Sequence, residues 1–247
     1  MTSIDLNADM GEYSNDAEHA NEAALMPLIT SCSIACGGHA GDVETMRATV
    51  RLAKDHGVRV GAHPSYPDRA GFGRRSIAFD LEDLASALRA QLDALNAAAI
   101  AEGVSVTHVK AHGALYNDAA KNPDLARVVA GLTGNAILVG PPGSALEAAA
   151  QEAGLRFARE GFVDRLYLAS GALTPRSEHD AVIADIDARA RQARAIALGE
   201  KFSAGDGDLS INADTLCVHS DSPGAVETAK AVRASLESAA ISIRPFA

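Results

Sequence analysis

The sequence has 247 residues, of which 47% are hydrophobic and 22% are charged, and its formal net charge at pH 7 is -10. This hydrophobic fraction excludes a disordered chain and is sufficient to bury a large core. The acidic balance and the lack of any basic run argue against a nucleic-acid-binding surface, which requires clustered lysine and arginine.

Short apolar segments with β-forming residues alternate with longer, alanine-rich segments along the chain. The first kind predicts strands and the second predicts helices. In chain order, the expected elements are strands at 3–9 and 29–36, a helix at 43–56, a strand at 58–63, a helix at 81–102, a strand at 104–112, a helix at 123–132, a strand at 136–140, a helix at 144–153, a strand at 155–160, a helix at 180–198, a strand at 215–219, a helix at 224–239 and a last run at 241–244 that could close the sheet. The stretch 199–214 is rich in glycine and aspartate and predicts a loop or a small hairpin.

Several predicted helices carry end signals. Asp42, Asp80 and Ser144 are suited to cap first turns, and Gly57 and Gly103 fall where helices should end. Because strands alternate with helices throughout, we predict one α/β domain over residues 1–247. In it, about seven or eight parallel strands form a TIM-like (β/α) barrel that its helices cover. An open, doubly wound sheet is the alternative.

The three cysteines indicate the compartment. Cys32, Cys36 and Cys217 are an odd set without a CxxC pair, which fits a reducing compartment rather than a disulfide framework or a zinc site. The first residues are acidic and lack the apolar run of a signal peptide, and no window approaches the length of a membrane span. We therefore predict a cytoplasmic protein that binds neither membranes nor nucleic acid.

Polar side chains follow most of the predicted strands. In parallel α/β folds the carboxyl ends of the strands meet at one rim, so residues far apart in sequence can face one pocket. The predicted pocket residues are Asp9 and Glu12 after the first strand, Cys36 and His39 after the second, His63 and Asp68 after the third, Lys110 and His112 at the fourth, Asp164 and Arg165 after the sixth, and His219 and Asp221 after the seventh.

The segment 108–117 carries the strongest single signal. Its residues 108, 110 and 112 share one strand face, so Lys110 stands between two histidines in an apolar strand. Because an unpaired buried ammonium group is costly, Lys110 should meet one of the acidic pocket residues or a bound anion. His112 lies nearest the rim and is the better catalytic candidate, whereas His108 is a candidate for the core.

Two further features have two interpretations each. Arg74 and Arg75 end a loop rich in glycine and proline, which either closes over an anionic ligand or is a solvated basic loop. Cys36, with His39 close by, is either a nucleophile or a small buried apolar residue, the commoner fate of cysteine.

Four long motifs resemble the LamB/YcsF family, whose members are A subunits of 5-oxoprolinase. They are DLNADMGE at 5–12, IACGGHAGD at 34–42, GAHPSYPD at 61–68 with GFGRR at 71–75, and KAHGALYN at 110–117. The resemblance continues through 164–167 and 219–223, and so covers essentially the whole chain. The departures, at Gly38, Ser65, Ala111 and Ser220, remove no ionisable candidate.

The resemblance implies a barrel of the glycoside hydrolase/deacetylase type with about seven parallel strands. It also implies ATP-dependent opening of 5-oxoproline to L-glutamate, with ATP as co-substrate and with partner subunits B and C. The sequence has no GxxxxGK[ST] loop, so ATP would bind through other loops or partly on a partner.

A mechanism consistent with that activity starts with phosphorylation of the lactam oxygen. In it, Asp9 or Glu12 is the general base toward water, His112 is the acid for the ring nitrogen, Lys110 offsets the developing charge and Arg74 or Arg75 holds the substrate carboxylate. The catalytic candidates are Asp9, Glu12, His39, Lys110 and His112, and the candidates for binding substrate or ATP are His63, Asp68, Arg74, Arg75, Tyr116, Asn117, Arg165, His219 and Asp221.

Two other classes of function stay open. Asp9, His39, His63 and His112 offer a carboxylate and imidazoles to a divalent metal ion that activates water, as in a metal-dependent hydrolase or deacetylase, although they lack a tight HxxxH-type spacing. Alternatively, the chain is a non-catalytic subunit that delivers a cyclic substrate to its partners.

Overall fold

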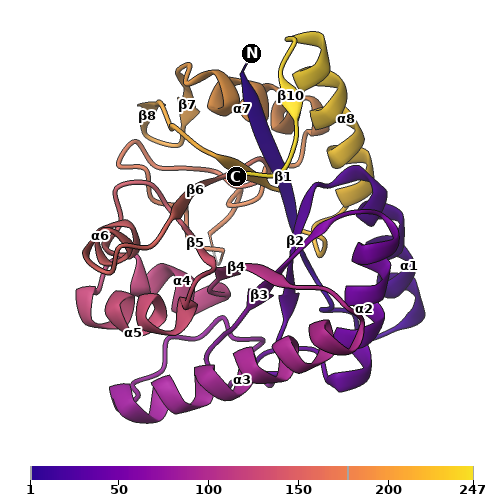
Figure 1. Ribbon diagram of the computed structural model, residues 1–247. Helices are drawn as coiled ribbons and strands as arrows, with labels where there is room; N and C mark the ends of the chain where they lie inside the picture. The colour runs from indigo at the N-terminus through magenta and orange to yellow at the C-terminus, as the bar shows by residue number, and fades with distance from the viewer. Residues whose placement is uncertain (1, 177, 247) are drawn as a thin grey trace.

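Seven parallel strands close into a barrel at the centre of the molecule (Figure 1). The computed structural model describes residues 2–176 and 178–246. Around the barrel the strands are β1 (Ser3–Met10), β2 (Ser31–Ala35), β3 (Arg59–His63), β4 (Val106–Lys110), β5 (Ile137–Gly140), β6 (Phe157–Phe162) and β9 (Thr215–Cys217). Strand β9 pairs with both β6 and β1, which closes the barrel. The prediction of a TIM-like barrel is therefore confirmed, and the alternative of an open sheet is wrong.

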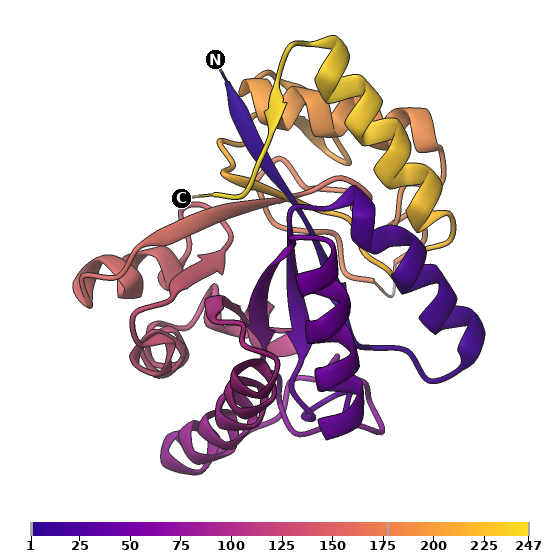
Figure 2. The same ribbon diagram turned by 45° about the vertical axis from the view of Figure 1, so that its right-hand side comes forward.

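The six predicted helices lie on the outside of the barrel, as Figure 2 shows. The side chains of Asp42, Asp80 and Ser144 accept hydrogen bonds from first-turn backbone N–H groups, as expected of N-caps. Helix α7 begins at Ile186 instead of 180, because Asp185 caps it there. The helices are α2 (Val43–Asp55), α3 (Leu81–Ala101), α5 (Pro123–Thr133), α6 (Ala145–Glu152), α7 (Ile186–Leu198) and α8 (Ala225–Ser238).

Other elements differ from expectation. The helices α1 (Asp16–Leu25), η1 (Met26–Leu28) and α4 (Gly113–Ala119) were not predicted. The expected hairpin within 199–214 is present as β7 (Phe202–Ala204) and β8 (Gly207–Leu209). The last strand, β10 (Ser242–Ile243), does not close the barrel, because β9 already joins β1 to β6. Among residues 2–176 and 178–246, β10 pairs with the first residues of β1 alone. No helix of the described residues is both long enough and apolar enough to span a bilayer.

Tightly packed groups fill the part of the barrel away from the cavity described below. Asp5 is buried and accepts hydrogen bonds from the hydroxyls of Thr30, Ser31 and Thr215. His108 is buried against Phe246, and burial lowers the pKa of His108 to about 3, so it is a neutral core residue, as expected.

Candidate active site

The carboxyl ends of the barrel strands surround a cavity of about 550 Å³, a size typical of small-molecule sites. Residues that lie far apart in the sequence therefore do meet at one rim, as predicted. The predicted residues that line the cavity are Asp9, Glu12, His63, Arg74, Lys110, His112, Tyr116, Asn117, Arg165, His219 and Asp221.

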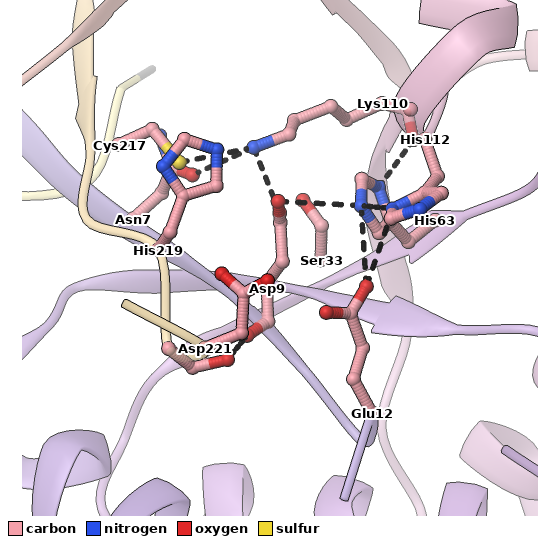
Figure 3. Close-up of polar contacts among 12 residues, drawn as sticks. Asn7, Asp9, Glu12, Ser33, His63, Lys110, His112, Cys217, His219 and Asp221 are labelled. Carbon is pink, nitrogen blue, oxygen red and sulfur yellow. Dashed lines mark hydrogen bonds and ion pairs between the residues drawn. The ribbon is translucent and has the colours of Figure 1, made fainter. Parts of the chain in front are cut away.

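Lys110 lies at the base of the cavity between two carboxylates. Its Nζ is 2.7 Å from Asp9 Oδ1 and 2.8 Å from Glu160 Oε1, and it also donates to Asn7 Oδ1 and Cys217 Sγ, each at 3.3 Å (Figure 3). The contact with Asp9 lacks hydrogen-bond alignment, so it is a close ion pair. The expectation that a carboxylate neutralises this buried ammonium group is confirmed.

The electrostatics keep both partners of this pair charged. Burial by itself raises the pKa of Asp9, but the positive charges of His63 and Lys110 outweigh it and hold that pKa well below its usual range. Burial by itself lowers the pKa of Lys110, but the neighbouring negative charges, Asp9 first, hold it well above its usual range. At neutral pH the cavity therefore contains a carboxylate and an ammonium ion rather than two neutral groups.

A second cluster lies beside this pair and consists of Glu12, His39, His63 and His112. Glu12 Oε1 is 2.8 Å from His39 Nε2, 3.2 Å from His112 Nδ1 and 3.8 Å from His63 Nε2. His63 Nε2 is also 3.0 Å from His112 Nδ1. The side chains of Glu12, His63 and His112 converge in Figure 3, and His39 stacks on His112 with ring centroids 3.6 Å apart.

Backbone carbonyl groups set the orientation of two of these rings. His63 donates from Nδ1 to the Lys110 carbonyl oxygen at 2.8 Å, and His112 donates from Nε2 to the Phe72 carbonyl oxygen at 2.9 Å. His112 therefore turns Nδ1 toward Glu12, whereas His63 turns Nε2 toward both Asp9 Oδ2, at 3.3 Å, and Glu12 Oε1, at 3.8 Å. Burial lowers the pKa of His39 to about 4, so this ring is neutral and donates from Nε2 to the Glu12 carboxylate.

Glu12 itself is held by a residue that the sequence did not single out. Glu22, from α1, accepts hydrogen bonds from the backbone N–H groups of Gly11 and Glu12, at 2.7 and 3.0 Å. Gly11 has φ of 72°, a conformation that favours glycine. Together these features fix the turn that brings Glu12 from β1 into the cluster.

His219 forms an oriented pair with Asp164. Its Nδ1 donates to Asp164 Oδ1 at 2.8 Å, and Ser222 donates to the other oxygen of the same carboxylate. Asp164 is buried, which by itself raises its pKa, but His219 and the hydroxyl of Ser222 lower that pKa to about 2. The ring stacks on Phe162 and lines the cavity, so its Nε2 is left for a ligand.

Arginine side chains line the outer part of the cavity. Arg74 and Arg176 both pair with Asp221. Arg165 donates to the carbonyl oxygens of Thr174 and Ala181, and burial lowers its pKa to about 10, so it remains charged. A guanidinium-rich rim of this kind suits a ligand with carboxylate or phosphate groups.

Two predicted binding residues do not reach the cavity. Arg75 pairs with Asp68 in the loop after β3, where the Arg75 side chain is 65% exposed, and neither residue lines the cavity. They shape that loop, because Asp68 also accepts from the backbone N–H of Gly71. Cys36 is not a nucleophile: its thiol is buried, donates to the Ile34 carbonyl oxygen and has a pKa raised by burial to about 12.

The Tyr116 hydroxyl is buried and makes no hydrogen bond to any residue that the structure describes. Burial and the negative charge of Glu160 raise the pKa of Tyr116 well above its usual value, so the hydroxyl keeps its proton. Glu160 Oε2 is also buried and without a hydrogen bond among the described residues. Tyr116 lines the cavity, so its hydroxyl is available to a polar atom of a ligand, whereas Glu160 does not line the cavity.

Comparison with known proteins gives consistent matches over the whole chain. A family model described as the LamB/YcsF family matches residues 4–247. A protein of Symbiobacterium thermophilum, named as the A subunit of 5-oxoprolinase, is 45% identical over 245 residues, which cover 97% of this chain and 94% of that protein. The protein of the same name from Thermus thermophilus is 43% identical over 249 residues, covering 98% and 99%.

Solved structures agree with the fold. The crystal structure of a lactam utilization protein from Thermus thermophilus is similar with a TM-score of 0.89 and 42% identity, covering 99% of this chain and 100% of that one. A family 4 carbohydrate esterase from Streptomyces lividans, at a TM-score of 0.52 and 12% identity over 98% of this chain and 91% of its own, is similar in fold alone.

Proposed function

Because this chain belongs to the LamB/YcsF family, we propose that it opens the ring of 5-oxoproline to give L-glutamate in a reaction coupled to ATP. The observation that carries the proposal is the charged pair of Lys110 and Asp9 at the base of a cavity with an arginine-rich rim. A small, anionic amide fits both parts: its carboxylate suits the guanidinium groups, and its carbonyl group suits the ammonium ion.

The chemistry begins with transfer of the γ-phosphoryl group of ATP to the lactam oxygen, which releases ADP and makes the ring carbon electrophilic. Water then attacks that carbon and gives a proton to Asp9. The low pKa of Asp9 makes it a weak base, so the electrophile must provide most of the driving force, which accounts for the use of ATP. Lys110 offsets the negative charge that develops on the oxygen atoms.

Ring opening follows when the carbon–nitrogen bond breaks and the ring nitrogen takes a proton. The orientation of His219 by Asp164 makes it a better acid for this step than His112, whose two nitrogens face Phe72 and the Glu12 cluster. The product of this step is an acyl phosphate, which a second water hydrolyses to glutamate and phosphate. Arg74, Arg165 and Asn117 line the cavity, and in this proposal they hold the substrate carboxylate or the phosphoryl group.

The relatives are named as the A subunit of 5-oxoprolinase, which supports a multi-subunit enzyme. We propose that subunits B and C are the partners, that ATP binds through loops of this chain or partly on a partner, and that the complex is cytoplasmic. If this chain only delivers the substrate, a variant of a cavity residue would weaken 5-oxoproline binding without changing the chemistry that the partners perform.

The test is to incubate the reconstituted subunits with ATP and 5-oxoproline and to measure glutamate and ADP together. We expect one ADP for each glutamate, with Lys110→Ala losing both products while its circular dichroism matches that of the unchanged protein. Glutamate without ADP would refute the coupling to ATP, and near-normal turnover by Lys110→Ala would remove this lysine from the site. Assay of the chain without its partners separates its own contribution from theirs.

A further inference from the structure

The cluster of Glu12, His39, His63 and His112 has no role in the chemistry above that requires three imidazoles. We propose that it binds one divalent transition-metal ion, through Glu12 Oε1, His39 Nε2, His63 Nε2 and His112 Nδ1. These four atoms all lie within 4.8 Å of one another. His63 ends β3, whereas Glu12, His39 and His112 lie in the segments that follow β1, β2 and β4, so neighbouring strands of the barrel bring the four residues together.

The spacing of the four atoms fits a four-coordinate ion. With bonds of about 2.0–2.1 Å to nitrogen or oxygen, the ligand atoms of a tetrahedral zinc site lie roughly 3.3–3.4 Å apart. The separations from Glu12 Oε1 to the three imidazole nitrogens are 2.8, 3.2 and 3.8 Å, and that between His63 and His112 is 3.0 Å. They lie on both sides of the tetrahedral value. His39 stacks on His112 with an interplanar angle of 2°, so its ring must rotate out of the stack for both nitrogens to point at one ion.

The hydrogen bonds around two of the rings, those of His63 and His112, also support a metal site. Imidazoles that bind metals usually donate their other N–H to a carbonyl or carboxylate oxygen, which fixes the ring. His63 and His112 both do this, to the carbonyl oxygens of Lys110 and Phe72. As a consequence His63 Nε2 and His112 Nδ1 face each other at 3.0 Å, and this contact needs a positive charge, which either a second proton on one ring or a metal ion between the two nitrogens can supply.

A second group of possible ligands in the same cavity differs on this point. Asp9, Cys217 and His219 also offer three closely spaced ligand atoms. The ammonium group of Lys110 already lies against two of them, at 2.7 Å from Asp9 and 3.3 Å from Cys217. The ammonium group of Lys110 therefore occupies the place of a metal ion in this second group. Substitution of His219 should leave cobalt binding unchanged, so His219 serves as the control for the three histidines of the proposed metal site.

The ligand set also indicates the class of ion. Three imidazoles and one carboxylate suit zinc, iron, nickel or cobalt in the divalent state, whereas magnesium and calcium prefer sites made of oxygen atoms. Because Glu12, His63 and His112 line the cavity, the ion would face the substrate, where a metal can activate water or polarise a carbonyl group.

The experiment uses the whole chain. One sample is freed of metal by chelation and titrated with Co²⁺, whose visible absorption reports binding. In a second, untreated sample the metal content is measured by mass spectrometry. We expect saturation at one equivalent, retained in His219→Gln. We expect affinity to fall at least 100-fold in His112→Gln and in His39→Gln.

Glu12→Gln serves as a further variant if a histidine variant does not fold, because the Glu12 side chain borders the open cavity. The proposal would be overturned if the unchanged chain bound cobalt only non-specifically. The positive charge between His63 Nε2 and His112 Nδ1 would then be a proton rather than a metal ion. Equal loss in His219→Gln, or none in His112→Gln, would also overturn the proposal. The readout needs no turnover, so this proposal can fail while the one on 5-oxoproline stands, and the reverse.

Discussion

Lys110 illustrates how a single buried charge organises this cavity. The residue is 2% exposed, and its ammonium group has a carboxylate on each side. The side-chain amide of Asn7 connects this group: its Nδ2 donates a hydrogen bond to Glu160, and its Oδ1 accepts one from Lys110. Removal of the lysine would leave the buried Glu160 carboxylate without a counter-charge and Asp9 with His63 as its remaining close partner, and such a defect costs several times what a surface ion pair contributes.

The first prediction compares Lys110→Met with Arg51→Met. The lysine variant should lose about 3–5 kcal/mol of the free energy of unfolding, because uncompensated buried charges remain. The arginine variant should lose far less, because Arg51 is 58% exposed in its ion pair with Glu102 and solvent screens that pair. Urea unfolding of both variants at pH 7.5 gives the two values, and equal losses would contradict the account of Lys110.

The second prediction concerns the pH dependence of stability. Burial raises the pKa of Asp5 from 3.8 to about 6, against the lowering effect of its hydroxyl donors. The folded chain therefore keeps this proton after the unfolded chain has released it, so stability should fall as the pH rises from about 4 to 6 and then level off. A shift of this size corresponds to about 3 kcal/mol.

Asp5→Asn, which has no such proton, should gain about 2 kcal/mol relative to the unchanged protein between pH 4 and pH 7.5, as measured by urea unfolding at both values. Asp93→Asn, at an exposed position of α3, is the control and should show no comparable change. A pH-independent difference for Asp5→Asn would show that its hydroxyl donors offset burial more fully than the raised pKa implies.

Most of the cavity residues were predictable, because parallel strands place their carboxyl ends together whatever the register. Glu160 was not, although it is a direct partner of Lys110. The two residues lie on β4 and β6, with β5 between them, and only the register and twist of three strands bring them to 2.8 Å. Asp68 and Arg75 lie outside the cavity because the two residues, which are close in one loop, form an ion pair with each other.

At the level of elements, predictions succeeded where local signals were strong. Helices with an aspartate or serine cap and an apolar stripe began at the expected residues. Helix α1 was missed because it buries only Glu22 and Leu25 and so lacks a clear apolar stripe. Helix α4 was missed because the predicted strand was extended to residue 112, whereas β4 ends at Lys110 and His112 starts the helix.

The third prediction compares a strand glycine with a helix glycine. In β3, a Cβ at Gly61 would lie 2.1 Å from His108 Nε2, so Gly61→Ala should lose at least about 2 kcal/mol through overpacking. In α5, a Cβ at Gly131 meets nothing within 4 Å, so Gly131→Ala should gain about 0.5–1 kcal/mol through helix propensity.

Thermal and urea unfolding of both variants test this comparison. If the clash with His108 is the cause, Gly61→Ala should cost little stability in a chain that already carries His108→Ala. A double-mutant cycle of the two substitutions measures this difference. A loss at Gly61→Ala that persists without the imidazole would instead point to the backbone of β3.

At the scale of the whole molecule, closure of the barrel depends on one short strand. Strand β9 has three residues, yet it pairs with β6 on one side and with β1 on the other. The sequence predicted that strand at 215–219 but assigned closure to the run after it, because strand length alone does not show which strand fills the last gap. Helices α7 and α8, which lie side by side in Figures 1 and 2, pack together over this region.

Strand β9 lies late in the sequence, and this position has a consequence for folding during synthesis. A ribosome that has released only the first 200 residues has delivered Asp9, Lys110 and Glu160, but not Cys217 or His219, and the gap between β1 and β6 still admits solvent. Water in that gap would weaken the attraction between the three charged groups. The strand that closes the barrel therefore also brings the last residues of the cavity, so the charged groups lose their contact with water only when the cavity lining is complete.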